Sequence, residues 1–401
     1  MPDVKRKVRK TKRSAKDTLR RAYRYRLYPT PEQEALLSKT FGCCRFLWNR
    51  FLEDRETWWE TNKSISPKDR VPLRQTPAAY KPDYPWLKEV DSFALCNVQM
   101  DFQQAWKNHF DNPKYFGRLR YKRKKAAQSY KTNSSNGQIR LVEGGIRLPK
   151  LGIVKARIHR LPEEGMQLKS ATVSRKASGK YFVSVLFEKP CIWPETVDMY
   201  TAPAVGLDYK SDGLFVASDG SRAIPPRLYR KEEKRLAKAQ RKLCRQRRMR
   251  KPGEAVSNNY LKQQRKVAAI HETIANRRND FLQKLSAEMT NRYDIICIES
   301  LDMKAMSNKG FGNGKATMDN GWGCFTRMLE YKLKRKGGLL VKVDKWFPSS
   351  QLCSHCGCQN TAVRDLSIRK WECPCCGAVL DRDENAAANI LMEGLRTIMA
   401  Y

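Results

Sequence analysis

The sequence predicts a multidomain α/β protein with a small β-barrel near its N-terminus, the barrel itself carrying a helical insertion. Three observations predict this fold class. Short alternating apolar runs separated by turn residues fill residues 117–189, which is typical of a small barrel. Two apolar runs, residues 205–208 and 294–299, each end in a carboxylate and alternate with helical stretches, as in a buried parallel sheet. Two CxxC motifs near the C-terminus predict a small metal-binding module.

The charge balance of the chain points to a polyanionic partner. Of its 401 residues, 79 are Lys or Arg and 41 are Asp or Glu, so the formal net charge is +38. Solubility does not require a charge of this size, and nucleic acid is the commonest partner for it. A ribosomal-type or aggregation-resistant surface is the alternative, which the acidic residues described below disfavour.

Composition also excludes several classes of protein. The chain has no run of 18 apolar residues, so we expect no membrane span, and its basic N-terminus lacks the apolar segment of a secretory signal. Its 13 cysteines are odd in number, which favours a reducing compartment over a disulfide framework. Its four histidines lie far apart in sequence, which leaves carboxylates and metal as the economical catalytic groups.

The N-terminal elements can be predicted in order. Residues 1–21 hold ten Lys or Arg against two Asp, which predicts a basic arm resting on nucleic acid. Alternation over residues 22–28 predicts a strand. Thr30 and Gln33 have the spacing of a capping box and begin a predicted helix over residues 32–62.

The residues that follow predict a helical module inserted in the barrel. A loop at residues 63–84 separates the first helix from a second helical stretch over about residues 90–110. Because the strand at residues 22–28 precedes both helices, we expect it to complete the barrel that resumes after them. The later barrel strands are expected at Gln138–Val142, Gly145–Leu148, Ile153–Ile158, Ala171–Ser174 and Tyr181–Phe187.

Two basic stretches predict contacts with a phosphate backbone. Arg118–Lys125 holds six Lys or Arg residues, and residues 227–251 hold 13 in 25 positions. The second stretch is expected to form one arm of an antiparallel helix pair over residues 227–290. A solvated helix laced with salt bridges is the alternative, for which only Glu232 and Glu233 offer partners. The candidate contact residues are Arg118, Arg120, Lys122, Arg123, Lys238, Arg241 and Arg245.

The α/β domain is expected to begin at the strand over residues 205–208. Residues 214–217 are its predicted hairpin partner, and the strand over residues 294–299 repeats the pattern of an apolar run that ends in a carboxylate. Residues 321–336 are predicted to be helical, and residues 339–343 form another apolar strand before the cysteine motifs.

Three carboxylates are predicted to converge in this domain. Asp208 and Glu299 end two strands, and Asp383 lies where a helix should begin. Sites in open α/β sheets gather at the carboxyl ends of strands, and converging carboxylates suit Mg²⁺ or Mn²⁺. Two such ions could activate water and stabilise the leaving oxygen of a phosphodiester. From the residues alone, Asp381 is as good a candidate as Asp383, and a single acid of this kind would be a cap or a turn.

A zinc site is predicted at the two CxxC motifs, Cys353-x-x-Cys356 and Cys373-x-x-Cys376. Cys358 and Cys375 lie close enough in sequence to compete as ligands. The CxxC register favours the four cysteines of the motifs, since each pair wraps one knuckle turn. A pair of metal-free buried cysteine turns is the alternative.

Taken in order, many short segments of the chain resemble the transposon-encoded TnpB family, also called OrfB, of RNA-guided nucleases related to compact type V CRISPR effectors. The segments cover nearly the whole chain and are specific in their order and spacing. They are Tyr25–Thr30, Gly42–Asn49, Pro85–Asn97, Ser129–Thr132, Val205–Asp208, Ile295–Glu299, Gly321–Gly323, Leu329–Lys332, Phe347–Cys353 and Asp381–Ile390.

The resemblance implies a RuvC-like nuclease domain of the ribonuclease H fold. In the family the third acid is the second Asp of the DRDxNAA segment, which implies Asp383 rather than Asp381. Many relatives have a glycine two residues after the first acid, whereas this chain reads DYKSDG over Asp208–Gly213. The implied domains are a basic arm (1–21), a wedge β-barrel (22–45 and 117–200), a helical recognition insertion (46–116), a RuvC-like domain (201–350 and 378–401) with the basic helix pair (227–290), and a zinc-binding knuckle (351–377).

The activity that the resemblance implies is RNA-guided DNA cleavage beside a short adjacent motif, in which guide pairing reads the sequence and the protein reads the motif. The expected partners are a guide RNA and double-stranded target DNA, with one monomer per RNA, in a prokaryotic cytoplasm and associated with the nucleoid. The expected cofactors are structural Zn²⁺ and catalytic Mg²⁺, with Mn²⁺ as a substitute. A CRISPR-associated effector of the same build, a non-catalytic zinc protein that binds nucleic acid, and a transposase that joins DNA ends are the alternatives.

Family positions that read the adjacent motif fall in the segment FALxN and in the loop after SYKT. In this chain they are Ser92, Phe93, Cys96, Ser135 and Asn136. Relatives often carry Lys and Gln at the positions of Ser92 and Cys96, so the motif that this chain prefers does not transfer from them. Ordinary helix packing is the alternative explanation of the segment.

Overall fold

The computed structural model describes residues 18–66, 68–124, 128–249, 254–307, 314–365 and 367–400. The chain divides into two compact units, Met1–Cys191 and Ile192–Tyr401. Residues 1–17, the main part of the predicted basic arm, lie outside the described residues. Within the described part of the chain, no helix has both the length and the apolar character needed to cross a membrane.

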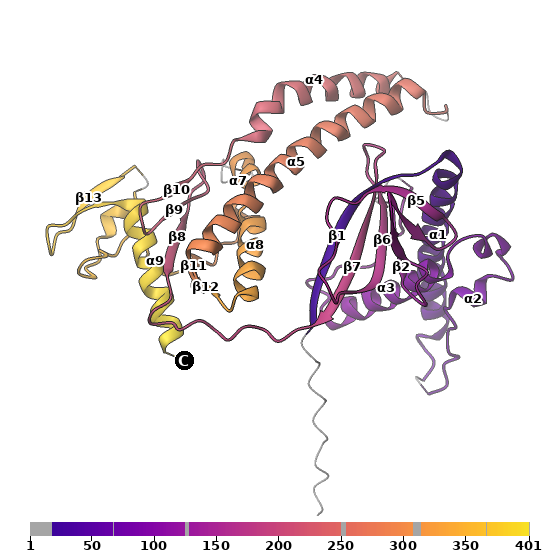
Figure 1. The fold of residues 1–401 in the computed structure, drawn as a ribbon, viewed down its shortest axis with the longest axis horizontal. Helices are drawn as coiled ribbons and strands as arrows, with labels where there is room; N and C mark the ends of the chain where they lie inside the picture. Colours follow the sequence, from indigo (N-terminus) through magenta and orange to yellow (C-terminus); the bar gives the residue numbers. More distant parts are fainter. Residues whose placement is uncertain are drawn as a thin grey trace, which may run out of the picture. The chain divides into compact units, whose positions relative to one another are not determined.

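The N-terminal unit is built on a seven-stranded sheet in which every pairing is antiparallel (Figure 1). The strand order is β2-β6-β7-β1-β5-β4-β3, and no pairing of β2 with β3 closes the ladder among the described residues. The strands are β1 (Thr18–Tyr28), β2 (Gln128–Asn133), β3 (Arg140–Val142), β4 (Gly145–Leu148), β5 (Gly152–Arg157), β6 (Gln167–Arg175) and β7 (Tyr181–Pro190).

Sequence patterns predict most of these strands, and β4 has the predicted bounds. Strand β1 begins at Thr18, so the end of the predicted arm belongs to the sheet. The basic residues at its start do not show the alternation of a strand, but Arg20 and Arg21 form ion pairs with Glu188 and Glu163. Strand β2 is missing from the predictions, since its sequence QSYKTN is polar and its alternation rests on two buried positions.

Two long helices, α1 (Pro31–Asn62) and α3 (Ser92–Asp111), form the predicted helical module. The capping box of α1 is confirmed: the backbone N–H of Gln33 donates to Thr30 Oγ1 at 3.3 Å, and Gln33 Oε1 accepts from the backbone N–H of Thr30 at 3.1 Å. Both helices share one apolar core with the sheet. The predicted loop between them is partly helical, with α2 (Pro77–Tyr80) and a 3-10 turn η1 (Pro85–Lys88) after it.

The C-terminal unit is built on a five-stranded mixed sheet with the order β10-β9-β8-β11-β12. Strands β8, β11 and β12 are parallel, and β9 and β10 continue from β8 as an antiparallel edge. The strands are β8 (Ala204–Tyr209), β9 (Phe215–Ala217), β10 (Arg222–Ala223), β11 (Ile295–Glu299) and β12 (Leu339–Val343).

Helices cover both faces of this sheet, which explains why its strands are apolar without alternation. On β11, Ile296 and Ile298 pack with α5 and α8, whereas Ile295 and Cys297 pack with α9. The helices are α4 (Leu228–Arg248), α5 (Asn258–Arg292), α6 (Met303–Met306), α7 (Gly314–Asn320), α8 (Trp322–Arg335) and α9 (Arg382–Met399). The predicted helix pair is present as α4 and α5, joined by a small apolar seam that includes Leu236 and Ile270.

Candidate active site and cysteine cluster

The sheet of the C-terminal unit brings Asp208 and Glu299 to the same level on neighbouring strands. Strands β8 and β11 run parallel, and Leu207 pairs with Ile298. Asp208 and Glu299 follow these two residues, so both carboxylates lie at the carboxyl end of the sheet, where sites of open α/β folds gather.

Helix α9 brings the third acid to this end of the sheet. Asp381 is the N-cap of α9, and its Oδ1 accepts the backbone N–H groups of Asp383 at 3.0 Å and Glu384 at 3.2 Å. The carboxylate of Asp381 is therefore engaged in capping. Asp383, in the first turn, contributes its charge to the environment of Asp208.

A glycine allows α9 to approach β8 closely enough for this arrangement. A Cβ on Gly206 would lie 2.1 Å from the backbone oxygen of Ala387 and 2.7 Å from the backbone nitrogen of Leu391. Gly394 has the same role one strand away, since a Cβ there would lie 2.3 Å from Cys297 Sγ. Two glycines, one on a strand and one on the helix, thus fix the distance between α9 and the sheet.

Asp208 lies within the electrostatic reach of both other acids. Burial raises the pKa of Asp208 well above its ordinary value, and the charges of Glu299 and Asp383 raise it further, while Arg382 and Lys210 partly offset them. Burial also raises the pKa of Glu299, against the lowering effect of the hydrogen bond from Ser349. The protein thus disfavours the charged forms of Asp208 and Glu299, and a cation between them would stabilise those forms.

Two of the three acids, Asp383 and Glu299, already contact donor groups of the protein. Lys210 Nζ lies 2.5 Å from Asp383 Oδ2, and Ser349 Oγ donates to Glu299 Oε1 at 2.6 Å. The guanidinium of Arg369 lies 3.7 Å from the other oxygen of Asp383. Among the described residues, only cysteines form groups of three or more ligand atoms within 4.8 Å of one another, so the three carboxylates do not form such a cluster.

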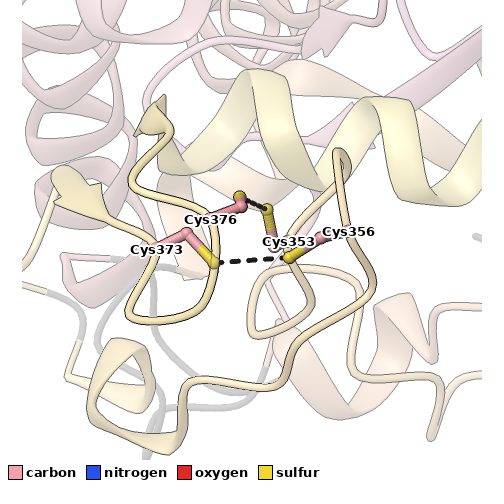
Figure 2. Close-up of side chains that lie close together, drawn as sticks. All are labelled: Cys353, Cys356, Cys373 and Cys376. Atoms are coloured by element: carbon pink, nitrogen blue, oxygen red, sulfur yellow. Dashed lines mark hydrogen bonds between the residues drawn. The ribbon is translucent and has the colours of Figure 1, made fainter.

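The four cysteines of the CxxC motifs do gather into one cluster. Their Sγ atoms all lie within 4.8 Å of one another. Figure 2 shows the two closest pairs across the cluster, Cys353 with Cys376 at 3.7 Å and Cys356 with Cys373 at 3.5 Å. Four clustered thiols from two knuckles match the ligand chemistry of a structural zinc site.

The two knuckles have the same backbone geometry. In the first, the N–H of Gly357 donates to Cys353 O at 2.8 Å; in the second, the N–H of Gly377 donates to Cys373 O at 2.9 Å. Both glycines have positive φ, 75° and 69°, which a residue with a side chain rarely adopts. Each knuckle thus turns its two thiols to the same side.

The remaining two cysteines of this region, Cys358 and Cys375, are joined by a disulfide. Their sulfurs also lie within 4.8 Å of Cys373 Sγ. Because they are bonded to each other, the four thiols of the CxxC motifs are the free set, and the competition that the sequence leaves open is not realised in this structure. This disulfide departs from the expectation of a reducing compartment that the odd number of cysteines suggested.

Hydrogen bonds connect the cysteine cluster to the helix that carries Asp383. The side-chain amide of Asn385 donates to Leu352 O at 2.7 Å and its carbonyl accepts from Ser354 N at 2.8 Å. One turn later, Asn389 donates to Ser349 O and Leu352 O, both at 2.7 Å. The first knuckle is therefore attached to the first two turns of α9.

The predicted motif-reading residues lie in the N-terminal unit. Ser92 and Cys96 are exposed one turn apart at the start of α3, and Phe93 between them is half-buried. Ser135 and Asn136 lie in the turn after β2, where Asn136 has a φ of 48°. Helix α3 packs against β2, so the two groups belong to one packed unit.

The predicted backbone-contact residues are all exposed, as a phosphate-binding role requires. Lys122 differs from the others in its contacts, because its Nζ lies 3.7 Å from the centroid of the Trp48 ring and desolvation lowers its pKa. Its ammonium is thus engaged within its own unit. The other exposed residues are Arg118, Arg120, Arg123, Lys238, Arg241 and Arg245.

The fold defines a class: a two-unit, mixed α/β protein with carboxylates at the strand ends of one sheet and a four-cysteine cluster in the same unit. Three family models match the chain. They are a "Helix-turn-helix domain" of OrfB/IS605 proteins over residues 19–64, which here is β1 and the single helix α1, the OrfB/IS605 "Probable transposase" over residues 188–309, and the "Cas12f1-like, TNB domain" over residues 322–390.

Two relatives that match almost the whole chain establish the family to which it belongs. A protein of Streptomyces pristinaespiralis named "Putative RNA-guided DNA endonuclease" is 37% identical over 94% of this chain and 90% of its own length. The "Putative RNA-guided DNA endonuclease InsQ" of Escherichia coli K12 is 30% identical over 93% of this chain and 92% of its own. The chain belongs to the TnpB family, the OrfB proteins of IS605 transposons, which confirms the resemblance found in the sequence.

A solved structure shows the same fold in another protein. The protein chain of a Cas12f1–sgRNA–target DNA complex superimposes with a TM-score of 0.58 at 14% sequence identity, over 93% of this chain and 98% of that one. At this identity the similarity concerns the fold alone.

Proposed function

We propose that this protein is an RNA-guided DNA endonuclease whose active site is formed by Asp208, Glu299 and Asp383. The observation that carries the proposal is the convergence of three acids from β8, β11 and α9 on one environment, in which Glu299 and Asp383 both raise the pKa of Asp208. The names of the full-length relatives support guided cleavage of DNA, and the net charge of +38 supplies the attraction for nucleic acid.

The finer fold assignment is part of the proposal. The sheet order β10-β9-β8-β11-β12, with an antiparallel edge and three parallel strands, supports a RuvC-like domain of the ribonuclease H fold. The antiparallel sheet of the N-terminal unit supports a wedge domain in which the helices α1 and α3 are inserted. The proposed domain boundaries are those of the sequence analysis with two changes: the arm ends before Thr18, where β1 begins, and the helical insertion begins at Pro31 with α1.

The residues of the acid site fit a divalent cation. They offer carboxylate oxygens, the ligands that Mg²⁺ and Mn²⁺ prefer, and for Asp208 and Glu299 burial raises the pKa, so that a bound cation would stabilise their ionised forms. When bound, such ions would supply an activated water and a charge beside the leaving oxygen. Asp208 and Glu299 would hold them from the sheet and Asp383 from the helix, while Ser349 orients the Glu299 carboxylate.

The four-cysteine cluster is proposed to hold a structural zinc ion. All four positions of a tetrahedral site are then filled by thiolates, so this ion would have no open position for chemistry. Its role would be to fix the knuckles against α9 through Asn385 and Asn389.

The nucleic-acid surfaces are proposed from exposure and charge. The exposed cations of α4, with those of residues 118–123, would follow the backbones of guide RNA and target DNA. Ser92, Cys96 and Asn136, all exposed in the N-terminal unit, would face the motif beside the target.

Two measurements test the proposal. Sequencing of RNA that co-purifies with the chain is expected to show one defined RNA, which contains the guide segment, and not a mixture of fragments. With a matching guide, the protein is expected to cut plasmid DNA in Mg²⁺, and Asp208→Asn is expected to abolish cutting, whereas Asp280→Asn, which removes an exposed charge on α5, is expected to retain it. Random RNA fragments, strand-transfer products formed without RNA, or cutting by Asp208→Asn would overturn the proposal.

A further inference from the structure

Lys210 places a cation of the protein directly on one of the proposed ligands. Its Nζ lies 2.5 Å from Asp383 Oδ2, and the two side chains are only 26% and 14% exposed. The pair joins the end of β8 to the first turn of α9, across 173 positions of sequence. A charge pair that is largely shielded from water is weakened much less by salt than a surface pair.

The backbone around Lys210 is held in place from two sides. The amide of Asn320, which is buried, donates to Lys210 O at 3.2 Å and to Ser211 O at 3.0 Å. The N–H of Lys210 donates to Leu214 O at 3.2 Å. The turn Asp208–Gly213, which departs from the family pattern, therefore holds Lys210 at the site and does not leave it free in solvent.

The other groups around the acids do not have the same effect. Of the two cations that pair with Asp383, Arg369 is farther away, at 3.7 Å, and its side chain is 61% exposed. Glu299 accepts its hydrogen bond from the neutral hydroxyl of Ser349. Within the described site, Lys210 is the cation in closest contact with a proposed ligand oxygen.

We infer that Lys210 is a positioning residue that competes with the divalent cation for Asp383, and so sets the concentration of Mg²⁺ or Mn²⁺ that the site requires. Mg²⁺ binds a carboxylate oxygen at about 2.0–2.1 Å and would repel an ammonium held on the same oxygen. Lys210 must leave Oδ2 before that oxygen can bind the ion. The inference rests on the proposed function, since it takes Asp383 as a metal ligand.

Binding of Mn²⁺ to the full-length chain, freed of nucleic acid and followed by electron paramagnetic resonance of the free ion, tests this without any cleavage. Lys210→Met is expected to lower the Kd for Mn²⁺ by about three- to tenfold, because competition and charge repulsion both disappear. Lys210→Arg keeps the charge and is expected to bind Mn²⁺ as weakly as the unaltered chain. A merely structural role predicts the opposite of the first result, since a damaged site would bind the ion more weakly.

A matched control removes an ion pair of the same length at the opposite end of β11. Lys336 Nζ lies 2.5 Å from Asp294 Oδ1, with side chains 34% and 31% exposed. Lys336→Met is expected to leave the Kd for Mn²⁺ unchanged, and thermal melting of each variant shows that it is folded.

The possible results separate this inference from the proposed function. If Asp208→Asn removes Mn²⁺ binding but Lys210→Met binds as the unaltered chain or more weakly, the role of Lys210 is wrong and the metal site stands. If the unaltered chain shows no Mn²⁺ binding that depends on Asp208, both the metal site and the role of Lys210 are overturned.

Discussion

The C-terminal unit holds two candidate metal sites that are built in different ways. The thiols of the cysteine cluster lie within 4.8 Å of one another, whereas the three carboxylates share an environment without gathering to that extent. Each thiol pair comes from one short knuckle with a glycine of positive φ. The acids come from three elements far apart in sequence, and their positions depend on how β8, β11 and α9 pack.

The difference shows that local chain geometry places the thiols, whereas tertiary packing and charge decide how closely the carboxylates approach. A knuckle places its two thiols by local backbone geometry, so the two sulfur atoms lie near each other whenever the turn forms. Carboxylates in a buried site repel one another and accept donors from the protein, here Lys210 and Ser349. We therefore expect loss of a ligand to act oppositely on the stability of the two sites.

The largest effect on stability is expected at the thiols. Cys373→Ser removes a buried ligand, and because binding energy at a structural zinc site is folding energy, the knuckle region is expected to unfold. Zinc content measured by mass spectrometry should fall from one ion per chain to none. The melting transition of the knuckle region should be lost. Cys324→Ser, at an exposed thiol on α8, is the control and should keep both. A folded, zinc-containing Cys373→Ser protein would contradict the proposed ligand set.

The opposite sign is expected at the acids. Asp208→Asn should reduce guided cleavage by about a thousandfold or more yet raise the melting temperature in the absence of divalent ions. The raised pKa of Asp208 means that the folded protein disfavours its charged form, so the unaltered chain should lose stability as pH rises from below the ordinary carboxyl range toward neutrality. Denaturant unfolding at several pH values checks this. A melting temperature lowered by Asp208→Asn would show that the carboxylate is compensated within the protein.

A smaller effect is expected where packing sets the distance between the acids. Gly206→Ala places a methyl group against the backbone of α9, which cannot rotate away, at a cost of about 1–3 kcal/mol in unfolding free energy. Cleavage should fall as well, because the added methyl group would displace α9 and so move Asp383 away from Asp208. Gly323→Ala, in helix α8 with no atom within 4 Å of the added Cβ, is the control and should stabilise or do nothing. Equal behaviour of the two variants would refute the role given to the close approach.

The smallest effect is expected from the hydroxyl that orients Glu299. Ser349→Ala removes one hydrogen bond to a carboxylate, worth about 1.5–3 kcal/mol at most, and should lower the cleavage rate by about tenfold. Ser354→Ala retains the backbone N–H that bonds Asn385 and provides the matched control. A cleavage rate unaffected by Ser349→Ala would mean that Glu299 is held by other groups.

The sequence predicts features that depend on neighbours in the chain and misses those that depend on distant ones. The capping box at Thr30, strand β12 and the thiol cluster follow from local patterns, and the structure contains all three. Strand β2 and the start of β1 escape prediction, because polar and basic residues pair across the sheet. At the acid site, the strand-end positions were predictable, but the partner of Lys210 lies 173 residues away, beyond any spacing rule.

The first two turns of α9 serve three neighbours at once. The charge of Asp383 acts on Asp208, Ala387 lies against Gly206, and Asn385 and Asn389 bind the loop that precedes the first knuckle through hydrogen bonds. A shift of this segment by one residue would rotate all three sets of contacts out of place together. A displacement of the first knuckle would therefore pass directly to α9, and through α9 to Asp383.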